Sequence, residues 1–106
     1  MKGRTFEDLA VKYLSDKGYK ILERNLRSPY GEIDILAERS GRKVIIEVKG
    51  SNSFFPTEKL TKKKIERLLK TFFFHYDEEV SLELIVVYRG KIYHYKNLEW
   101  SYEEKL

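Results

Sequence analysis

The side chains of Asp34, Glu47 and Lys49 are of the types that could carry out chemistry together. Two carboxylates can hold a divalent metal ion, because hard cations such as Mg²⁺ bind carboxylate oxygens. A lysine beside such a metal can stabilise the negative charge that develops when a phosphodiester bond is hydrolysed. If the fold brings them together, these residues indicate metal-dependent phosphodiester hydrolysis, with Mg²⁺ or Mn²⁺ as the cofactor.

A β-hairpin would bring these residues together, because two β-rich runs flank a Ser-Gly turn signal between them. In the register that a two-residue loop sets, Asp34 falls opposite Glu47, and Lys49 follows on the same face. Directly opposed like charges destabilise a sheet. The two acids would therefore be solvated, share a proton or hold a divalent cation. On the apolar face the same register pairs Ile33 with Val48, Ile35 with Ile46, and Ala37 with Val44.

The motif around these residues resembles a known family. Asp34 followed by Glu47-Val-Lys49 matches the D-x(n)-(D/E)-x-K pattern of metal-dependent nucleases with the restriction-endonuclease-like fold. The longer phrases Gly31-Glu-Ile-Asp34 and Ile46-Glu-Val-Lys49 resemble the YraN-like family, small proteins described as related to archaeal Holliday junction resolvases. The resemblance implies a metal-dependent endonuclease acting on DNA, with branched DNA as one candidate substrate. Because the related resolvases are dimers, it also implies a homodimer, with the aromatic loop or the C-terminal tail as candidate interface.

The resemblance adds Glu7 and Lys64 to the site. Family members carry a glutamate near the start of the first helix, and Glu7 would be a further metal ligand; the residues alone indicate an acid placed by the helix dipole. Lys64 matches a family lysine and would hold a phosphate. Ser51, Phe6 and Ile65 stand where the family often has arginine, a small residue and glutamine. These departures leave a non-catalytic nucleic-acid-binding module as the alternative function.

A basic cluster follows the acids in the sequence. Such a run is usually a solvated helix face, but its place next to the acids predicts a phosphate track. We assign Lys63, Arg67 and the upstream Arg27 to nucleic-acid binding, while Arg24 and Arg27 could equally be solvated surface charges. Phe54 and Phe55 could pack in the core or stack on unpaired bases. The basic residues of the second helix are Lys59, Lys62, Lys63, Lys64, Arg67 and Lys70.

Two helices and five strands are expected to position these residues. Their order, α-β-β-β-α-β-β, predicts an α/β fold with a mixed sheet flanked by helices, in agreement with a restriction-endonuclease-like core. The expected elements are a helix from Thr5 to about Lys17, a strand from Tyr19 to Asn25, the hairpin, a loop from Gly50 to Pro56, a helix from Thr57 or Thr61 to about Tyr76, and strands at Leu82 to Tyr88 and Lys91 to Tyr95.

The composition predicts one folded domain spanning residues 1–106, with 42% hydrophobic residues and a net charge of +4. The absence of cysteine excludes disulfides and cysteine-ligated metals, and the two histidines, His75 and His94, are too few for a histidine-built zinc site. Neither a signal peptide nor an apolar run long enough to span a membrane is visible. We therefore expect a soluble cytoplasmic protein that does not associate with membranes.

Overall fold

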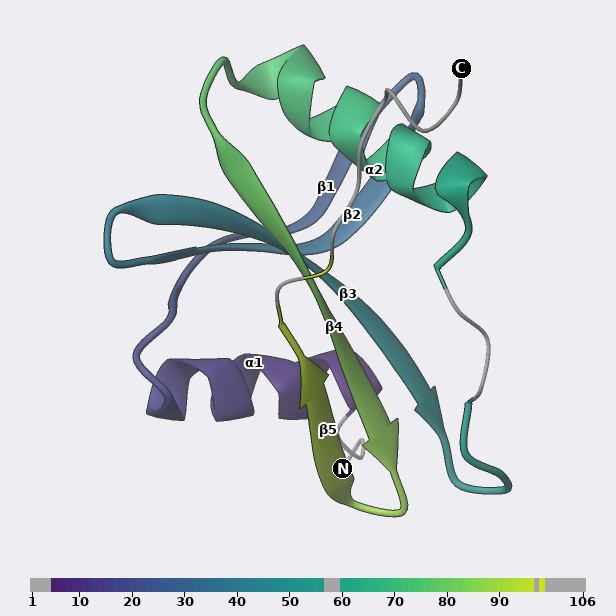
Figure 1. Cartoon of the computed structure of the whole chain (residues 1–106). Coiled ribbons are helices and arrows are strands. Elements are labelled where there is room, and N and C mark those ends of the chain that lie inside the picture. Colours follow the sequence, from purple (N-terminus) through teal and green to yellow (C-terminus); the bar gives the residue numbers. More distant parts are fainter. Residues whose placement is uncertain (1–4, 57–59, 97, 99–106) are drawn as a thin grey trace.

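A computed structural model describes residues 5–56, 60–96 and 98 of the chain. Its helices and strands follow the predicted order α-β-β-β-α-β-β, which confirms the mixed α/β fold. The two helices flank the sheet, as Figure 1 shows. In chain order the elements are α1 (Phe6–Asp16), β1 (Lys20–Ser28), β2 (Gly31–Arg39), β3 (Arg42–Ser51), α2 (Lys62–His75), β4 (Val80–Tyr88) and β5 (Lys91–Tyr95).

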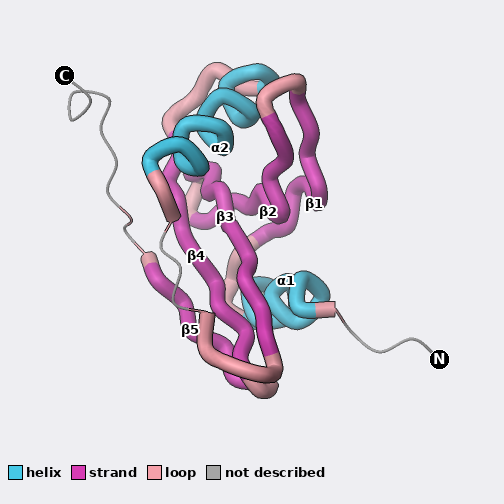
Figure 2. Tube along the Cα trace, turned by 90° about the vertical axis from the view of Figure 1, so that its right-hand side faces the viewer, coloured by secondary structure: helices cyan, strands magenta, loops and turns pink. Residues whose placement is uncertain are grey.

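The five described strands form one sheet in the order β1-β2-β3-β4-β5. Neighbouring strands are antiparallel except for β3 and β4, which run parallel. Parallel neighbours cannot be joined by a tight turn, and here α2 forms the crossover between them. In the view of Figure 2, α2 and α1 lie on different sides of the strongly twisted sheet.

Both faces of the central strands are buried, because each helix covers one of them. Ala10 and Leu14 of α1 pack on one face, and Leu68, Leu69 and Phe72 of α2 pack on the other. Strands that are covered on both sides have nearly continuous apolar sequences, as β4 has. The sheet residues on the α1 side include Ile35, Ala37, Val44, Ile46, Ile85 and Val87, and those on the α2 side include Ile33, Leu36, Ile45 and Leu82.

The predicted hairpin register is confirmed from Arg39–Arg42 down to Ile35–Ile46. The turn residues Ser40 and Gly41 have φ values of 53° and 77°, as a two-residue turn that matches strand twist requires. The backbone pairing of β2 with β3 ends at Ile35–Ile46.

The predicted pairing of Ile33 with Val48 is wrong. Ile33 packs on the α2 side of the sheet, whereas Val48 packs on the α1 side. On β1, the residue at this level is Asn25, between the pairs Arg24–Ile35 and Leu26–Ile33, and its φ of 55° kinks the strand. The simple alternation of faces therefore fails at the level of Asp34.

Several element boundaries also differ from the predictions. β1 continues to Ser28, and β3 includes Gly50 and Ser51, which were expected in a loop. A Cβ atom at Gly50 would overlap the ring of Phe6, so the glycine reflects a close approach of α1 to β3 rather than a chain break. At α2, the side chain of Thr61 accepts the backbone N–H of Lys64 and fixes the start of the helix.

Neither of the two described helices has the length and apolar character needed to cross a bilayer. Lys59 and the tail residues Trp100 and Tyr102 lie outside the described residues.

Candidate active site

Asp34 and Glu47 lie where β2 and β3 stop pairing through their backbones. The Oδ2 atom of Asp34 accepts a hydrogen bond from the backbone N–H of Val48, with 2.9 Å between the two atoms. This side-chain bond takes the place of a further backbone pair. It holds the carboxylate of Asp34 next to the residue that precedes Val48, which is Glu47.

The carboxylate of Glu47 is buried beside Asp34. Only 6% of the residue is exposed, and Oε1 has no hydrogen-bond partner among the described residues. Burial, and next the negative charge of Asp34, raise the pKa of Glu47 to about 7, although Lys64 acts in the opposite direction. An acid placed in this way favours either a proton or a cation.

Lys64 forms an ion pair with Glu47. Its Nζ atom lies 3.2 Å from Oε2 of Glu47, and its side chain is 43% exposed. The backbone N–H of Lys64 is bound by the side chain of Thr61 in the first turn of α2. Lys64 thus reaches Glu47 from the first turn of α2.

Lys49 follows Glu47 by two residues on β3. Strand alternation places both side chains on the side of β3 that carries Ile45, which is the side that α2 covers. Lys49 and Lys64 are both partly buried, in contrast to the exposed Lys63. The two predicted acids and the lysines at 49 and 64 thus come from neighbouring parts of β2, β3 and α2.

Glu7 is engaged elsewhere. Its Oε1 accepts a hydrogen bond from Nε of Arg24 at 3.0 Å, and its Oε2 accepts one from Nδ2 of Asn25 at 3.3 Å. Arg24 also binds Asp8 at 2.7 Å, so this arginine ties α1 to β1. Within the described part of the chain, no three acidic, histidine or cysteine side chains lie together as a metal site. The predicted set of three carboxylates is therefore not assembled in this arrangement.

The predicted phosphate-binding residues lie on an exposed surface. Lys63 and Arg67 are exposed along α2, which packs over β2 in Figure 1. Arg27, whose side chain is 80% exposed, lies 3.5 Å from Glu32 at the end of the β1–β2 hairpin. Exposed ion pairs of this kind contribute little to the free energy of folding. These cations could therefore leave such partners for a phosphate backbone.

The aromatic loop after β3 divides between packing and exposure. The ring of Phe55 makes edge contacts with Tyr88 and Tyr93, whereas Phe54 is 69% exposed. Phe55 is therefore partly buried against two tyrosines at the edge of the sheet, outside the two core clusters, and Phe54 is exposed.

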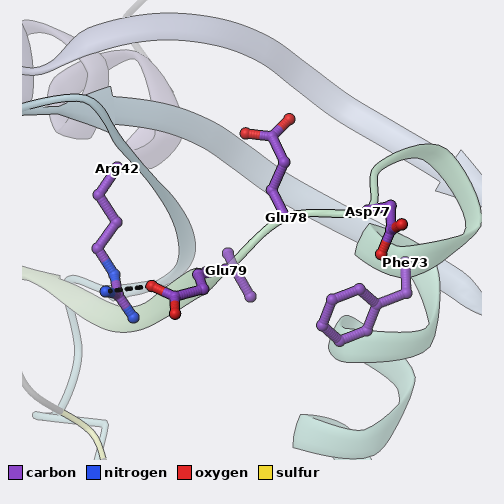
Figure 3. Close-up of a pocket in the computed structure, with 6 residues that line it drawn as sticks. Arg42, Phe73, Asp77, Glu78 and Glu79 are labelled. Atoms are coloured by element: carbon purple, nitrogen blue, oxygen red, sulfur yellow. Dashed lines mark hydrogen bonds and ion pairs between the residues drawn. The ribbon is translucent and has the colours of Figure 1, made fainter.

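The structure has a surface pocket, but neither Asp34 nor Glu47 lines it. It is formed where the C-terminal end of α2 leads into β4, and Figure 3 shows Arg42 paired with Glu79 at its edge, with 3.2 Å between Nη1 and Oε1. None of the residues predicted to act in catalysis or binding lines it. The lining residues are Arg42, Phe73, Asp77, Glu78, Glu79 and Val80.

Sequence comparison places the chain among known relatives. Residues 6–87 match the model of a family described as "Uncharacterised protein family UPF0102". A "UPF0102 protein" of Aquifex aeolicus is 64% identical over 99 residues, which cover 92% of this chain and 96% of the relative. One from Persephonella marina is 42% identical over 106 residues, covering 92% and 91%, and one from Thermotoga maritima is 49% identical over 77 residues, covering 71% and 70%. This chain belongs to the uncharacterised protein family UPF0102.

Proposed function

We propose that this protein is a Mg²⁺- or Mn²⁺-dependent endonuclease that hydrolyses phosphodiester bonds in DNA. The observation that supports the proposal is the carboxylate of Glu47, buried beside Asp34 with one oxygen atom unpartnered. A fold gains no stability from burying an acid next to another acid. The resemblance of the surrounding motif to the YraN-like family agrees with this assignment.

Asp34 and Glu47 fit a hard divalent cation. Both offer carboxylate oxygens, which Mg²⁺ and Mn²⁺ prefer, and Oε1 of Glu47 lacks the partner that a metal would provide. When bound, the metal would supply Lewis-acid chemistry, polarising the phosphoryl group and making water more nucleophilic. The Val48 N–H that holds Asp34 would orient this ligand, as hydrogen bonds to metal ligands commonly do.

The lysines and the helix end would act on the phosphate. Lys49, on the same side of β3 as Glu47, would stabilise the negative charge that grows on the phosphoryl oxygens. Lys64 and the N-terminus of α2 would attract the phosphate itself. Lys63, Arg67 and Arg27 would contact neighbouring phosphates, which position a nucleic acid without reading its sequence.

A non-catalytic nucleic-acid-binding module is the second candidate function. The ion pair between Lys64 and Glu47 favours it, because this pair neutralises one acid without any metal. The engagement of Glu7 by Arg24 and Asn25 favours it as well, because it leaves the two acids without a third. The basic face of α2 would serve either function.

DNA cleavage assays distinguish the two functions. Four-way junction, duplex and single-stranded DNA are incubated with the protein in Mg²⁺, in Mn²⁺ and in EDTA. We expect cleavage that needs metal and is lost in Glu47→Gln and in Lys49→Met. Glu79→Gln is the matched control, because this glutamate has an 86% exposed side chain and lies at the pocket in Figure 3, away from the acids.

Binding of DNA without cleavage in either metal would support the binding module and contradict the nuclease. Faster cutting of the junction than of the duplex would identify branched DNA as the preferred substrate. A homodimer would let two strands be cut symmetrically, and sedimentation equilibrium with and without the junction measures whether one forms.

A further inference from the structure

Lys64 occupies the place of a cation beside Glu47. Its ammonium nitrogen lies 3.2 Å from Oε2, on the acid that we propose as a metal ligand. An ammonium group and a divalent cation that neutralise the same carboxylate compete for it. The contact between Lys64 and Glu47 therefore has a consequence for metal binding.

We propose that Lys64 is an exchangeable counter-ion: it neutralises Glu47 until a divalent cation displaces it, and the released ammonium then binds a phosphate of the nucleic acid. This inference rests on the proposed function, because it takes Asp34 and Glu47 as the metal ligands. It adds that Lys64 couples the binding of the metal to the binding of the nucleic acid.

The burial of the two partners shows which one can move. Glu47 is 6% exposed and lies within a strand that is paired along its length with β4. The side chain of Lys64, in the first turn of α2, is 43% exposed. A lysine carries its charge on a flexible four-carbon stem. Its ammonium group can therefore leave Glu47 for solvent or for a phosphate while the helix, fixed at Thr61, stays in place.

The charge balance shows why the exchange needs a replacement cation. Removing the partner of a buried charge is strongly unfavourable, since the remaining charge is left uncompensated. Lys64 should therefore stay on Glu47 in the absence of metal. A divalent cation between the acids provides more positive charge than the lysine does, and it would also use the unpartnered Oε1 of Glu47.

The coupling follows from linkage. If the metal releases Lys64 and a phosphate captures it, each ligand raises the affinity for the other by the same factor. A permanent structural ion pair would behave differently, because Lys64 would then be unavailable to phosphate whether metal is bound or not.

Calorimetric titration of Mn²⁺ into the protein without DNA is the first test. We compare wild type with Lys64→Met and with Lys63→Met, which removes the same charge from the adjacent, exposed position. Without a competing ammonium group, Lys64→Met should bind Mn²⁺ about tenfold more tightly, within the usual range of such couplings. Lys63→Met should bind Mn²⁺ nearly as wild type does. Lys64→Gln serves as a second variant if methionine at this position impairs folding.

Fluorescence anisotropy with a hydrolysis-resistant phosphorothioate duplex is the second test. Wild type should bind this duplex more tightly in Mn²⁺ than in EDTA. In Lys64→Met this gain should shrink, whereas Lys63→Met should lose affinity equally in both conditions.

The results separate this inference from the proposed function. If wild type binds Mn²⁺ and Lys64→Met binds it equally or more weakly, the exchange is overturned while the metal site stands. If neither wild type nor Lys64→Met binds Mn²⁺, both proposals fail.

Discussion

The side chain of Asp34 accepts a hydrogen bond from the backbone N–H of Val48 across 2.9 Å, at the level where β2 and β3 no longer pair. Asp34 thus has a structural task, satisfying a backbone donor, besides any role as a metal ligand. The bond uses the Oδ2 atom of the carboxylate. The two tasks can be separated by substitution.

Asp34→Asn should keep the fold and lose metal affinity. An amide oxygen can still accept the Val48 N–H, but it lacks the negative charge that a cation requires. Asp34→Ala leaves that N–H without its partner, at a cost of about 1–3 kcal/mol. Urea denaturation should therefore show Asp34→Asn to be clearly more stable than Asp34→Ala. Mn²⁺ titration should show that both variants have lost metal affinity. Equal stability of the two variants would mean that the bond to Val48 contributes nothing.

Glu47 should make the protein less stable as the pH rises. Its pKa is raised from 4.5 to about 7 in the folded chain, so its favourable contribution is fully present below about pH 4.5 and is lost as the pH passes through 7. Between pH 5 and pH 8.5, wild type should lose about 2–3 kcal/mol more than Glu47→Gln, because one pKa unit corresponds to about 1.4 kcal/mol. Urea denaturation across this range measures the difference.

Saturating Mg²⁺ provides the control for that measurement. A bound cation favours the ionised carboxylate, so the loss of stability in wild type should become smaller when Mg²⁺ is present. Parallel pH profiles for wild type and Glu47→Gln without metal would contradict the raised pKa.

The order of the helices and strands and the turn of the hairpin could be predicted from the sequence, because both depend on local patterns. The Ser40-Gly41 turn sets the hairpin register as far as Ile35–Ile46, the chain neighbours of Asp34 and Glu47. The kink at Asn25 was not predictable in this way, since a positive φ at a non-glycine residue leaves no periodic signal.

Contacts between distant segments could not be predicted from the sequence either. The pairing of Lys64 with Glu47 depends on how α2 lies on the sheet. The sequence left Arg24 open between a solvated surface charge and a phosphate contact, and only the packing of α1 on β1 shows that it binds Glu7. His75 lies in the last turn of α2, and the packing of this helix brings its Nε2 to 2.6 Å from the carbonyl oxygen of Arg27 in β1.

Glu7→Gln should affect metal binding much less than Glu47→Gln does. Arg24 and Asn25 hold both carboxylate oxygens of Glu7, so it would have to leave these partners to reach a metal. Mn²⁺ calorimetry should show Glu7→Gln within a few-fold of wild type and Glu47→Gln without measurable binding. Comparable losses in the two variants would instead restore Glu7 as the third ligand that the resemblance implies.

Gly50→Ala should destabilise the protein because of Phe6. The added methyl group would overlap the ring of Phe6, and overpacking of this kind typically costs about 1–3 kcal/mol. Phe6→Ala removes the obstacle, so Gly50→Ala should cost markedly less in that background. A double-mutant cycle by urea denaturation measures this coupling. Additive effects would show that the strain at Gly50 arises from something other than the ring.

Tyr13→Phe should weaken the attachment of α1 to the last strands. The side chain of His94 is 6% exposed, and its Nε2 lies 2.7 Å from Oε1 of Glu83, which also accepts the hydroxyl of Tyr19. An imidazole that donates through Nε2 accepts at Nδ1, where the Tyr13 hydroxyl lies 3.0 Å away. Removing this hydroxyl takes away the partner of a partly buried ring nitrogen of His94.

The expected cost of Tyr13→Phe is about 1–2 kcal/mol. Tyr95→Phe is the matched control, because Tyr95 lies on the same strand as His94 and its side chain is exposed. Water can bind whatever group its hydroxyl leaves behind. Thermal denaturation should show a lower melting temperature for Tyr13→Phe alone. Equal shifts of the melting temperature in the two variants would mean that the hydroxyl of Tyr13 adds no stability. The buried pair of His94 and Glu83 would then be held in place by β4, β5 and Tyr19 alone.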